Sequence, residues 1–237
     1  FAQMGGTVLA SGDNGFARLI PKCMGVRAAG VQKGCMSSVF KLGQGEETIF
    51  PRCAEAPFIP FGSELLQLEP GPDTATYFTV TPEQPFGPPE CCYPTGTGTW
   101  PGIAVHPHGR GRAICLAGAM GSVYHSEGYQ NTLNLMQDVL FSLCGMESLA
   151  PELTPMVEVT LREKEGVKLL QLVNTTGCFA NKFVGPVPIR DVELILPGMT
   201  ASRVGALNGG EPCWNNTEKG LAITLPNLRN YEAITIE

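Results

Sequence analysis

One stretch of the sequence indicates the fold of the first half of the chain: Gly109-Arg110-Gly111-Arg112-Ala113-Ile114-Cys115-Leu116-Ala117-Gly118. Its residues 112–117 form a nearly continuous apolar run, which is typical of a strand buried on both faces of a sheet. Residues 102–106 form another apolar run, and the glycines at 109 and 111 predict a turn between the two runs. The stretch therefore predicts a β-hairpin within a buried sheet.

The N-terminal residues predict another strand of the same domain. Residues 1–5 look like the end of a helix followed by a glycine turn, and residues 6–10 form a short apolar strand, so we expect the chain to begin inside a domain. Turn-forming residues follow at 11–15, at the carboxyl end of that strand, where α/β sheets bind their ligands. Asp13 and Asn14 are therefore candidate ligand-binding residues, with turn formation as the simpler interpretation.

The segment between Phe16 and Pro101 has little regular pattern. Short runs typical of strands occur at residues 37–42, 63–68 and 74–81. Residues 82–90 are rich in proline, which lacks the backbone donor that a helix or a central strand needs. We expect a surface loop at 82–90.

A helix is predicted to end at Gly145, after a polar loop at residues 118–128. Apolar side chains recur before that glycine at spacings of three and four residues: Leu133, Met136, Leu140 and Leu143. This spacing indicates one apolar helix face. A glycine directly after it is a common C-terminal stop.

His125 and Glu127 lie between the buried strand and the predicted helix. Strand ends and helix-terminal amides normally form a crevice there, so a general acid or base at His125 or Glu127 is one hypothesis. The interpretation we favour is local: Ser126 caps the helix, and Glu127 faces the positive end of the helix dipole.

The pattern changes beyond Pro151, where apolar and polar residues alternate with a period of two. Six strand candidates result: residues 157–161, 167–173, 192–196, 203–207, 221–225 and 232–236. Short, evenly spaced strands without a helix favour a β-sandwich. We therefore place a domain boundary at about residue 150, with an α/β domain at 1–150 and an all-β domain at 151–237.

Composition limits the possible partners. Of the 237 residues, 43% are hydrophobic and 16% are charged, which predicts a folded chain. The formal net charge is -6, so nucleic acids and anionic membranes are poor partners. No run approaches the roughly 18 apolar residues of a membrane span. We expect a cytoplasmic protein whose nine cysteines are reduced, buried thiols, with one or two disulfides in a secreted protein as the alternative, and we expect no cofactor.

The histidines offer a weak metal motif. His106 and His108 form a His-x-His pair, which would place both rings on one side of an extended segment. His125 or Glu127 is a conceivable third ligand. An exposed polar hairpin is the interpretation that we favour, so no metal is predicted.

Two features of the second half have alternative interpretations. Trp214, in a predicted loop at residues 211–216, could stack on a sugar ring, although an aromatic residue in a turn more often covers a sandwich core. The sequons that begin at Asn174 and Asn215 would be modified only in a eukaryotic secretory setting.

The order of the segments resembles the non-catalytic C-terminal part of glycoside hydrolase family 42 β-galactosidases. The resemblance is carried by residues 5–12, 88–90, 109–118, the helix ending at Gly145, and residues 172–177 and 188–194. It implies a partial flavodoxin-like domain of the class I glutamine amidotransferase type, incomplete at its N-terminus, followed by a small β-sandwich. In that family the α/β domain mediates trimerisation, and a barrel with two catalytic glutamates precedes it.

No catalytic residue is carried over by this resemblance. The barrel has no counterpart among residues 1–237, and an amidotransferase nucleophile sits on a Gly-x-Cys-x-Gly elbow. Cys115 has Ala113 and Ala117 at the two glycine positions, so the elbow is missing. Glycoside hydrolysis needs a pair of carboxyl groups, and the sequence identifies no such pair.

The leading hypothesis is a non-catalytic structural and oligomerisation region of a bacterial glycoside-hydrolase-like protein of carbohydrate metabolism. Its partners would be copies of itself, three by resemblance, or an upstream barrel domain. One alternative is a small-molecule enzyme that uses His125, Glu127 and Asp13. Another is a carbohydrate-binding module centred on Trp214.

Overall fold

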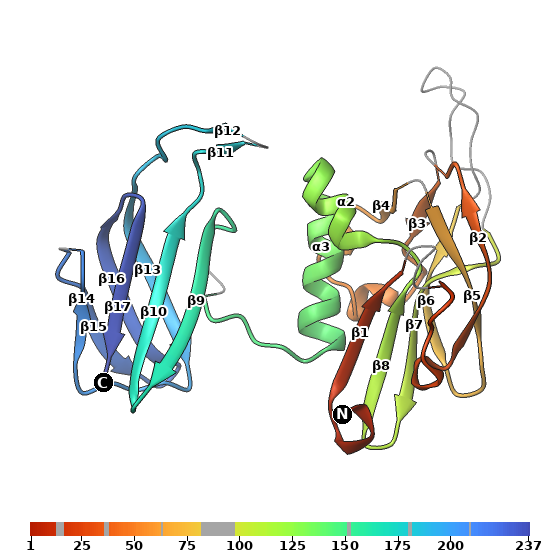
Figure 1. The fold of residues 1–237 in the computed structure, drawn as a ribbon, viewed down its shortest axis with the longest axis horizontal. Coiled ribbons are helices and arrows are strands. Elements are labelled where there is room, and N and C mark those ends of the chain that lie inside the picture. The colour runs from red at the N-terminus through yellow and green to blue at the C-terminus, as the bar shows by residue number, and fades with distance from the viewer. Residues whose placement is uncertain are drawn as a thin grey trace. The chain divides into compact units, whose positions relative to one another are not determined.

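The computed structural model describes residues 1–12, 17–35, 38–62, 64–81, 98–150, 153–179, 182–208 and 210–237. Within these residues the protein is mostly β-sheet with few helices, and it divides into two compact units, Phe1–Met146 and Glu147–Glu237 (Figure 1). Asp13, Asn14, the proline-rich segment 82–90 and the adjacent Cys91 and Cys92 lie outside the described residues.

The first unit contains a six-stranded sheet and a separate two-stranded sheet. The six strands lie in the order β1 (Thr7–Ser11), β8 (Gly111–Leu116), β7 (Pro101–His108), β6 (Ala75–Val80), β3 (Val39–Lys41) and β4 (Phe58–Pro60). β1 pairs with β8 in parallel, and the other neighbouring strands of this sheet pair antiparallel. The two-stranded sheet joins β2 (Val26–Lys33) to β5 (Glu64–Pro70). The described residues of this unit also form short 3-10 helices: η1 (Ala2–Met4), η2 (Lys22–Met24), η3 (Glu46–Thr48) and η4 (Cys53–Glu55).

The buried hairpin predicted from residues 102–117 is confirmed. β7 and β8 pair antiparallel on either side of Gly109, which has a φ of 63° that favours glycine. Residues 113–116 of β8 are fully buried, because the strand lies between β1 and β7 and contributes to the core of the unit. The apolar run therefore identified an interior strand of the sheet.

Two helices follow β8: α2 (Met120–Glu127) and α3 (Gln130–Asp138), which continues as a π-helical turn, η6 (Val139–Leu143). The predicted polar loop at 118–128 is therefore wrong. The predicted helix exists and ends before Gly145 at φ 67°, but it buries Leu135 and Val139 more completely than Leu133. Among the described residues, no helix is both long and apolar enough to cross a membrane.

A buried carboxylate ties α3 to η4. Asp138, the last residue of α3, is fully buried. Its two oxygens accept hydrogen bonds from the backbone N–H of Arg52 at 2.9 Å, the backbone N–H of Cys53 at 3.1 Å, and Nη1 of Arg52 at 3.0 Å. A carboxylate out of water is costly unless its oxygens are paired. These bonds therefore fix the position of η4 against the helix.

The second unit has two sheets around one core. One sheet contains, in order, β14 (Val204–Ala206), β17 (Tyr231–Ile236), β10 (Val167–Asn174) and β9 (Val157–Lys164); the other contains β13 (Ile189–Pro197), β16 (Gly220–Leu228) and β15 (Cys213–Thr217). A small ladder joins β11 (Cys178–Phe179) to β12 (Lys182–Phe183). Buried side chains of both sheets form one cluster, which is a β-sandwich arrangement. Each of the six predicted strands is observed.

Trp214 lies on a strand, so the predicted loop at residues 211–216 is wrong. β15 begins at Cys213, and Trp214 lies opposite Ile223 of β16. Its side chain is half-buried and packs against the sandwich core. The strand was missed because Asn215 and Asn216 are common turn formers.

Asn174 closes the sandwich at the end of β10. It is 3% exposed, and its Nδ2 donates to the carbonyl oxygens of Arg229 at 2.7 Å, Val187 at 2.8 Å and Leu228 at 3.3 Å. Its Oδ1 accepts hydrogen bonds from the backbone N–H and the hydroxyl of Thr176 at 3.1 and 2.8 Å. The first sequon therefore provides the hydrogen bonds that join three segments of the unit.

Candidate functional site

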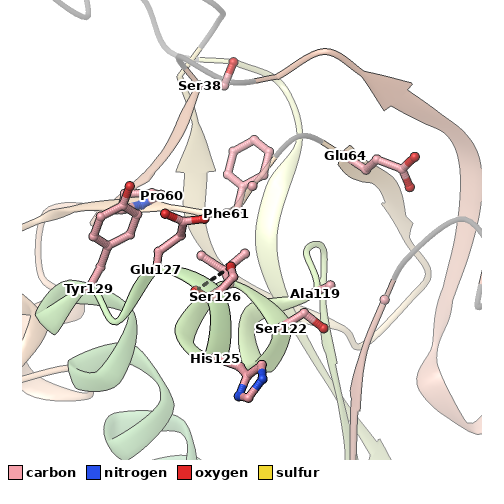
Figure 2. A pocket seen from close by; sticks show the side chains of 14 residues that line it. Ser38, Pro60, Phe61, Glu64, Ala119, Ser122, His125, Ser126, Glu127 and Tyr129 are labelled. Atoms are coloured by element: carbon pink, nitrogen blue, oxygen red, sulfur yellow. Dashed lines mark hydrogen bonds between the residues drawn. The ribbon is translucent and has the colours of Figure 1, made fainter. Parts of the chain in front are cut away.

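A pocket of about 860 Å³ lies in the first unit, where β1 and β8 end and the chain enters α2 (Figure 2). Ligands of α/β sheets commonly bind at this edge. The residues that line the pocket come from three regions of the sequence: Gly12; Ser38, Pro60, Phe61, Gly62 and Glu64; and Ala119, Gly121, Ser122, Val123, His125, Ser126, Glu127 and Tyr129.

Ser11 holds the turn from β8 into α2. Its Oγ donates to the carbonyl oxygen of Gly118 at 2.7 Å and accepts from the backbone N–H of Met120 at 3.0 Å. A side chain at Gly118 would come within 3.0 Å of Cβ of Phe61. The glycine thus allows α2 to lie close to residues 61 and 62, and both segments line the pocket.

His125 and Glu127 both line the pocket, but they do not face each other. They are two residues apart on α2, so their side chains leave the helix on different sides, as Figure 2 shows. Both residues are exposed. Ser126 lies between them, and its hydroxyl donates to the carbonyl oxygen of Val123 at 3.3 Å. The helix therefore does not assemble an acid and a base around one reacting atom.

The predicted capping role of Ser126 and Glu127 is wrong. Both residues lie in the last turn of α2, which ends at Gly128 with a φ of 67°. The N-cap residue of α3 is Tyr129, whose side chain makes no capping hydrogen bond. Glu127 is therefore at the negative end of a helix dipole, where a carboxylate is disfavoured.

Sequence reasoning missed the wall that residues 38–64 contribute. The Phe61 ring stacks on Phe40 with centroids 4.5 Å apart, and Glu64 forms an ion pair with Lys33 at 3.5 Å. These residues reach the pocket through the pairing of distant strands, which no local pattern reveals. Tyr129 lies between α2 and α3 and is 44% exposed. Its position directly after Gly128, which ends α2, is the feature of the sequence that could have indicated it as a pocket residue.

The pocket presents hydroxyl and carboxylate groups. Glu64 and Glu127 extend from opposite sides of it in Figure 2, and Ser38, Ser122 and Tyr129 add hydroxyl groups. Among the described lining residues there is no Lys or Arg. Such a set supplies hydrogen-bond partners to a neutral polar ligand.

The other candidate residues are not among the described residues that line this pocket. Asp13 and Asn14 lie outside the described residues. Trp214 belongs to the second unit. Of the described candidate residues, His125 and Glu127 line the pocket.

His106 and His108 do not meet the suggested third metal ligand. His108 pairs with Gly111 at the start of β8, whereas His125 lies on the helix that follows the other end of that strand. Nδ1 of His106 is instead 3.0 Å from Oγ1 of Thr74. In the part of the chain that the structure describes, no group of three His, Cys, Asp or Glu side chains could hold a metal ion. The suggestion of His125 or Glu127 as a third ligand is wrong.

The cysteines differ in exposure. Cys178 and Cys213 are exposed, so the prediction of buried thiols is wrong for these two. Burial raises the pKa of the Cys115 thiol to about 12, and burial together with the Asp138 carboxylate raises the pKa of Cys53. Because the thiolate is the reactive form, neither buried thiol is suited to nucleophilic catalysis.

Comparison with known proteins identifies structural relatives. No protein-family model matches the sequence, and no curated protein matches it. The chain is similar to α-L-fucosidase isoenzyme 2 from Paenibacillus thiaminolyticus, with a TM-score of 0.67, 16% identity, and coverage of 98% of this chain and 36% of that one. It is also similar to a cold-adapted β-galactosidase from Rahnella sp. R3, with a TM-score of 0.53, 15% identity, and coverage of 99% and 29%. A third similar structure is the β-galactosidase from Bacillus circulans sp. alkalophilus, with a TM-score of 0.52, 13% identity, and coverage of 100% and 30%.

These similarities show a shared fold at low sequence identity. The chain spans about a third of the length of the glycoside hydrolases it matches. Nearly all of this chain is covered in each comparison, so its two units together resemble one region of a larger glycoside hydrolase.

Proposed function

We propose that this chain is a non-catalytic structural and self-association region of a bacterial glycoside-hydrolase-like protein of carbohydrate metabolism. The observation that carries the proposal is the uneven coverage: 98% of this chain aligns with only 36% of the fucosidase. A region that accounts for a minor part of a hydrolase fits an accessory role. Its partners are then copies of itself or a barrel domain of the same protein.

The finer assignment of the first unit is part of this proposal. We assign it to a partial flavodoxin-like domain of the amidotransferase type. The parallel pair of β1 and β8 followed by α2 and α3 supports this assignment, because parallel strands joined to helices are the unit of doubly wound folds. The buried Cys115 on β8 supports a version without the nucleophile elbow.

The first test is catalysis by the isolated chain. Purified protein should hydrolyse neither nitrophenyl β-galactosides nor nitrophenyl α-L-fucosides above a buffer control. Turnover that disappears in Glu127→Gln or Glu64→Gln, and persists in Glu47→Gln on the exposed η3, would refute the non-catalytic role. The coding sequence on the N-terminal side of Phe1 gives an independent test, since a barrel domain with two catalytic carboxylates is expected there.

A second candidate function is the binding of a small neutral polar ligand, such as a monosaccharide, in the pocket of Figure 2. The volume of about 860 Å³ lies in the range of small-molecule sites. Calorimetric titration with galactose and with fucose should show binding that weakens in Glu127→Gln and in Tyr129→Ala but not in Glu47→Gln. The rival enzyme hypothesis requires turnover that is lost in His125→Ala.

A further inference from the structure

Most exposed large apolar side chains of the second unit gather at one end of its sandwich. β10 and β16 end there, and β9, β13 and β17 begin there, because these neighbouring strands pair antiparallel. A hydrogen bond from Asn174 at the end of β10 to Leu228 at the end of β16 joins the two sheets at this end. The described part of the unit has eight exposed large apolar side chains, and six of them lie at this end: Met156, Val173, Phe183, Val184, Val187 and Tyr231. We call these six residues the apolar end.

Hydrogen bonds at the end of β10 hold the segments of the apolar end together. Thr175 donates to the carbonyl oxygen of Met156 from its backbone N–H at 2.8 Å and from its hydroxyl at 2.7 Å. Nδ2 of Asn174 donates to the carbonyl oxygen of Val187 at 2.8 Å. The pairing of β10 with β17 adds Tyr231. Residues from four segments of the sequence therefore lie next to one another.

The segment that carries three of the six residues is anchored at its base. It extends beyond the end of β10 and includes β11 and β12 (Figure 1). The carbonyl oxygen of Gly177 accepts from the N–H of Val184 at 2.9 Å, and the hydroxyl of Thr176 accepts from the N–H of Val187 at 2.8 Å. Phe183, Val184 and Val187 are nevertheless 68%, 66% and 66% exposed. The segment therefore presents apolar side chains to water from a hydrogen-bonded backbone, which lowers the entropy cost of binding.

The size of the apolar end matches a protein interface. The six side chains are 37% to 68% exposed, which amounts to on the order of 500 Å² of apolar surface. The largest apolar patch of a typical monomer covers about 300–600 Å² and is often functional. Since about 60% of an interface is apolar, this surface corresponds to roughly 800 Å² on each partner, which is the usual size in a stable complex.

We propose that the apolar end packs against the apolar end of a second copy of this chain, around a twofold axis. A twofold contact places the same surface on both sides, and apolar side chains need no partner of a different chemistry. Every residue of this surface belongs to the second unit, between residues 156 and 231. The proposal rests on the self-association part of the proposed function and specifies the surface that performs it.

The charged residues beside the apolar end fit the pairing of two copies. Lys182 precedes Phe183, Arg229 lies close to Tyr231, and Glu158 lies opposite Val173. These three charged residues are exposed, and no ion pair within the described residues includes them. Charges of both signs are thus available to pair across a polar rim. The formal net charge of -6 opposes contact between acidic surfaces of two copies, which favours association through this apolar surface.

Two charged variants test the pairing. Phe183→Glu and Val187→Glu each place a carboxylate in the proposed contact, and each replaces an exposed side chain. Val167→Glu is the matched control, because Val167 is 38% exposed and lies at the start of β10, at the other end of the sandwich. Light scattering during size exclusion should give the mass of two chains for the unmodified protein and for Val167→Glu. The dissociation constant of each test variant should rise at least about tenfold.

Thiol labelling gives a second measurement on the unmodified protein. Cys178 lies opposite Phe183 on the β11–β12 ladder and is exposed in the single chain. Its labelling rate should be fast in dilute protein and should fall as the concentration rises through the dissociation constant. In Phe183→Glu this fall should shift to higher concentration. The exposed Cys213 on β15 is the internal control, and its rate should not depend on concentration.

The outcomes separate this proposal from the proposed function. A dimer or trimer that both test variants leave intact would overturn the end-to-end pairing and leave self-association standing. Equal dissociation by Val167→Glu would also overturn the pairing. A monomer at all concentrations would contradict the pairing and self-association together, whereas glycosidase turnover would contradict only the non-catalytic role. Circular dichroism checks that each variant folds, and either test variant suffices if the other does not.

Discussion

Removal of the Asp138 carboxylate should destabilise the first unit more than removal of any exposed carboxylate. Asp138→Ala leaves the backbone N–H groups of Arg52 and of the buried Cys53 without their acceptor. It also leaves the guanidinium of Arg52 without its ion-pair partner. The substitution therefore acts on η4 and α3 together.

The magnitude follows from the number and kind of bonds lost. A buried donor that loses its acceptor costs about 1–3 kcal/mol, and Asp138→Ala removes the acceptor of two backbone donors, so we expect a loss of about 2–5 kcal/mol. Asp138→Asn can keep an oxygen at the Oδ2 position, which accepts both backbone hydrogen bonds, but it then places an NH₂ group against Nη1 of Arg52, so we expect a loss of about 1–3 kcal/mol. Arg52→Ala should cost about 1 kcal/mol or less, because the Arg52 side chain is 43% exposed and the backbone bonds to Asp138 remain.

Urea unfolding monitored by tryptophan fluorescence measures these differences. Trp100 packs against the core of the first unit and Trp214 against that of the second, so the series should be built in a Trp214→Phe background to report on the first unit alone. Glu47→Ala on the exposed η3 is the matched control and should change the unfolding free energy by less than about 0.5 kcal/mol. A loss below about 1 kcal/mol for Asp138→Ala would refute the view that this carboxylate holds α3 to η4.

Three further predictions concern thiols, the boundary and the sandwich. Peptide mapping after thiol labelling should show fast modification of Cys178 and modification of Cys115 only after unfolding. Because burial raises the pKa of Cys115 from 9.0 to about 12, only the unfolded chain loses this proton between these two pH values. The free energy of unfolding should therefore fall as the pH rises from 9 to 12. Brief proteolysis should cut first at residues 147–155, and first cuts inside a sandwich strand would contradict the separation into two units. Asn174→Ala should lower the unfolding free energy of the second unit by about 2–4 kcal/mol, because it removes several buried hydrogen bonds, whereas the exposed Asn215→Ala should be nearly neutral.

The hydrophobic pattern of the sequence predicted those elements in which the burial of side chains follows one simple rule along the whole segment. The apolar run at 112–117 predicted β8 because a central strand needs apolar side chains on both faces, and the period of two beyond Pro151 predicted the sandwich strands. The helix α2 was missed because Gly121 and Ser122 interrupt a short segment in which only Met120 and Val123 are buried. Its burial comes from tertiary contacts that the periodicity does not contain.

The site was predicted less well than the fold, for a physical reason. A pocket is a property of segments that meet in space, and Ser38, Glu64 and Tyr129 meet only after β3, β5 and α2 have formed. The sequence indicated the strand end that carries His125 and Glu127, because helices and strand ends alternate in a recognisable order. The sequence contained no comparable signal for the lining residues between Ser38 and Glu64.

The environment of Asn174 has a consequence for how this protein should be produced. A glycan on the first sequon would be attached to Nδ2, the atom that donates hydrogen bonds to the carbonyl oxygens of Val187, Leu228 and Arg229. Oligosaccharide transfer in a secretory pathway takes place on the nascent, unfolded polypeptide, and a sugar at this nitrogen would then block closure of the sandwich. Expression in the bacterial cytosol avoids this modification, whereas secretion from yeast or mammalian cells would select for unglycosylated molecules or yield misfolded ones.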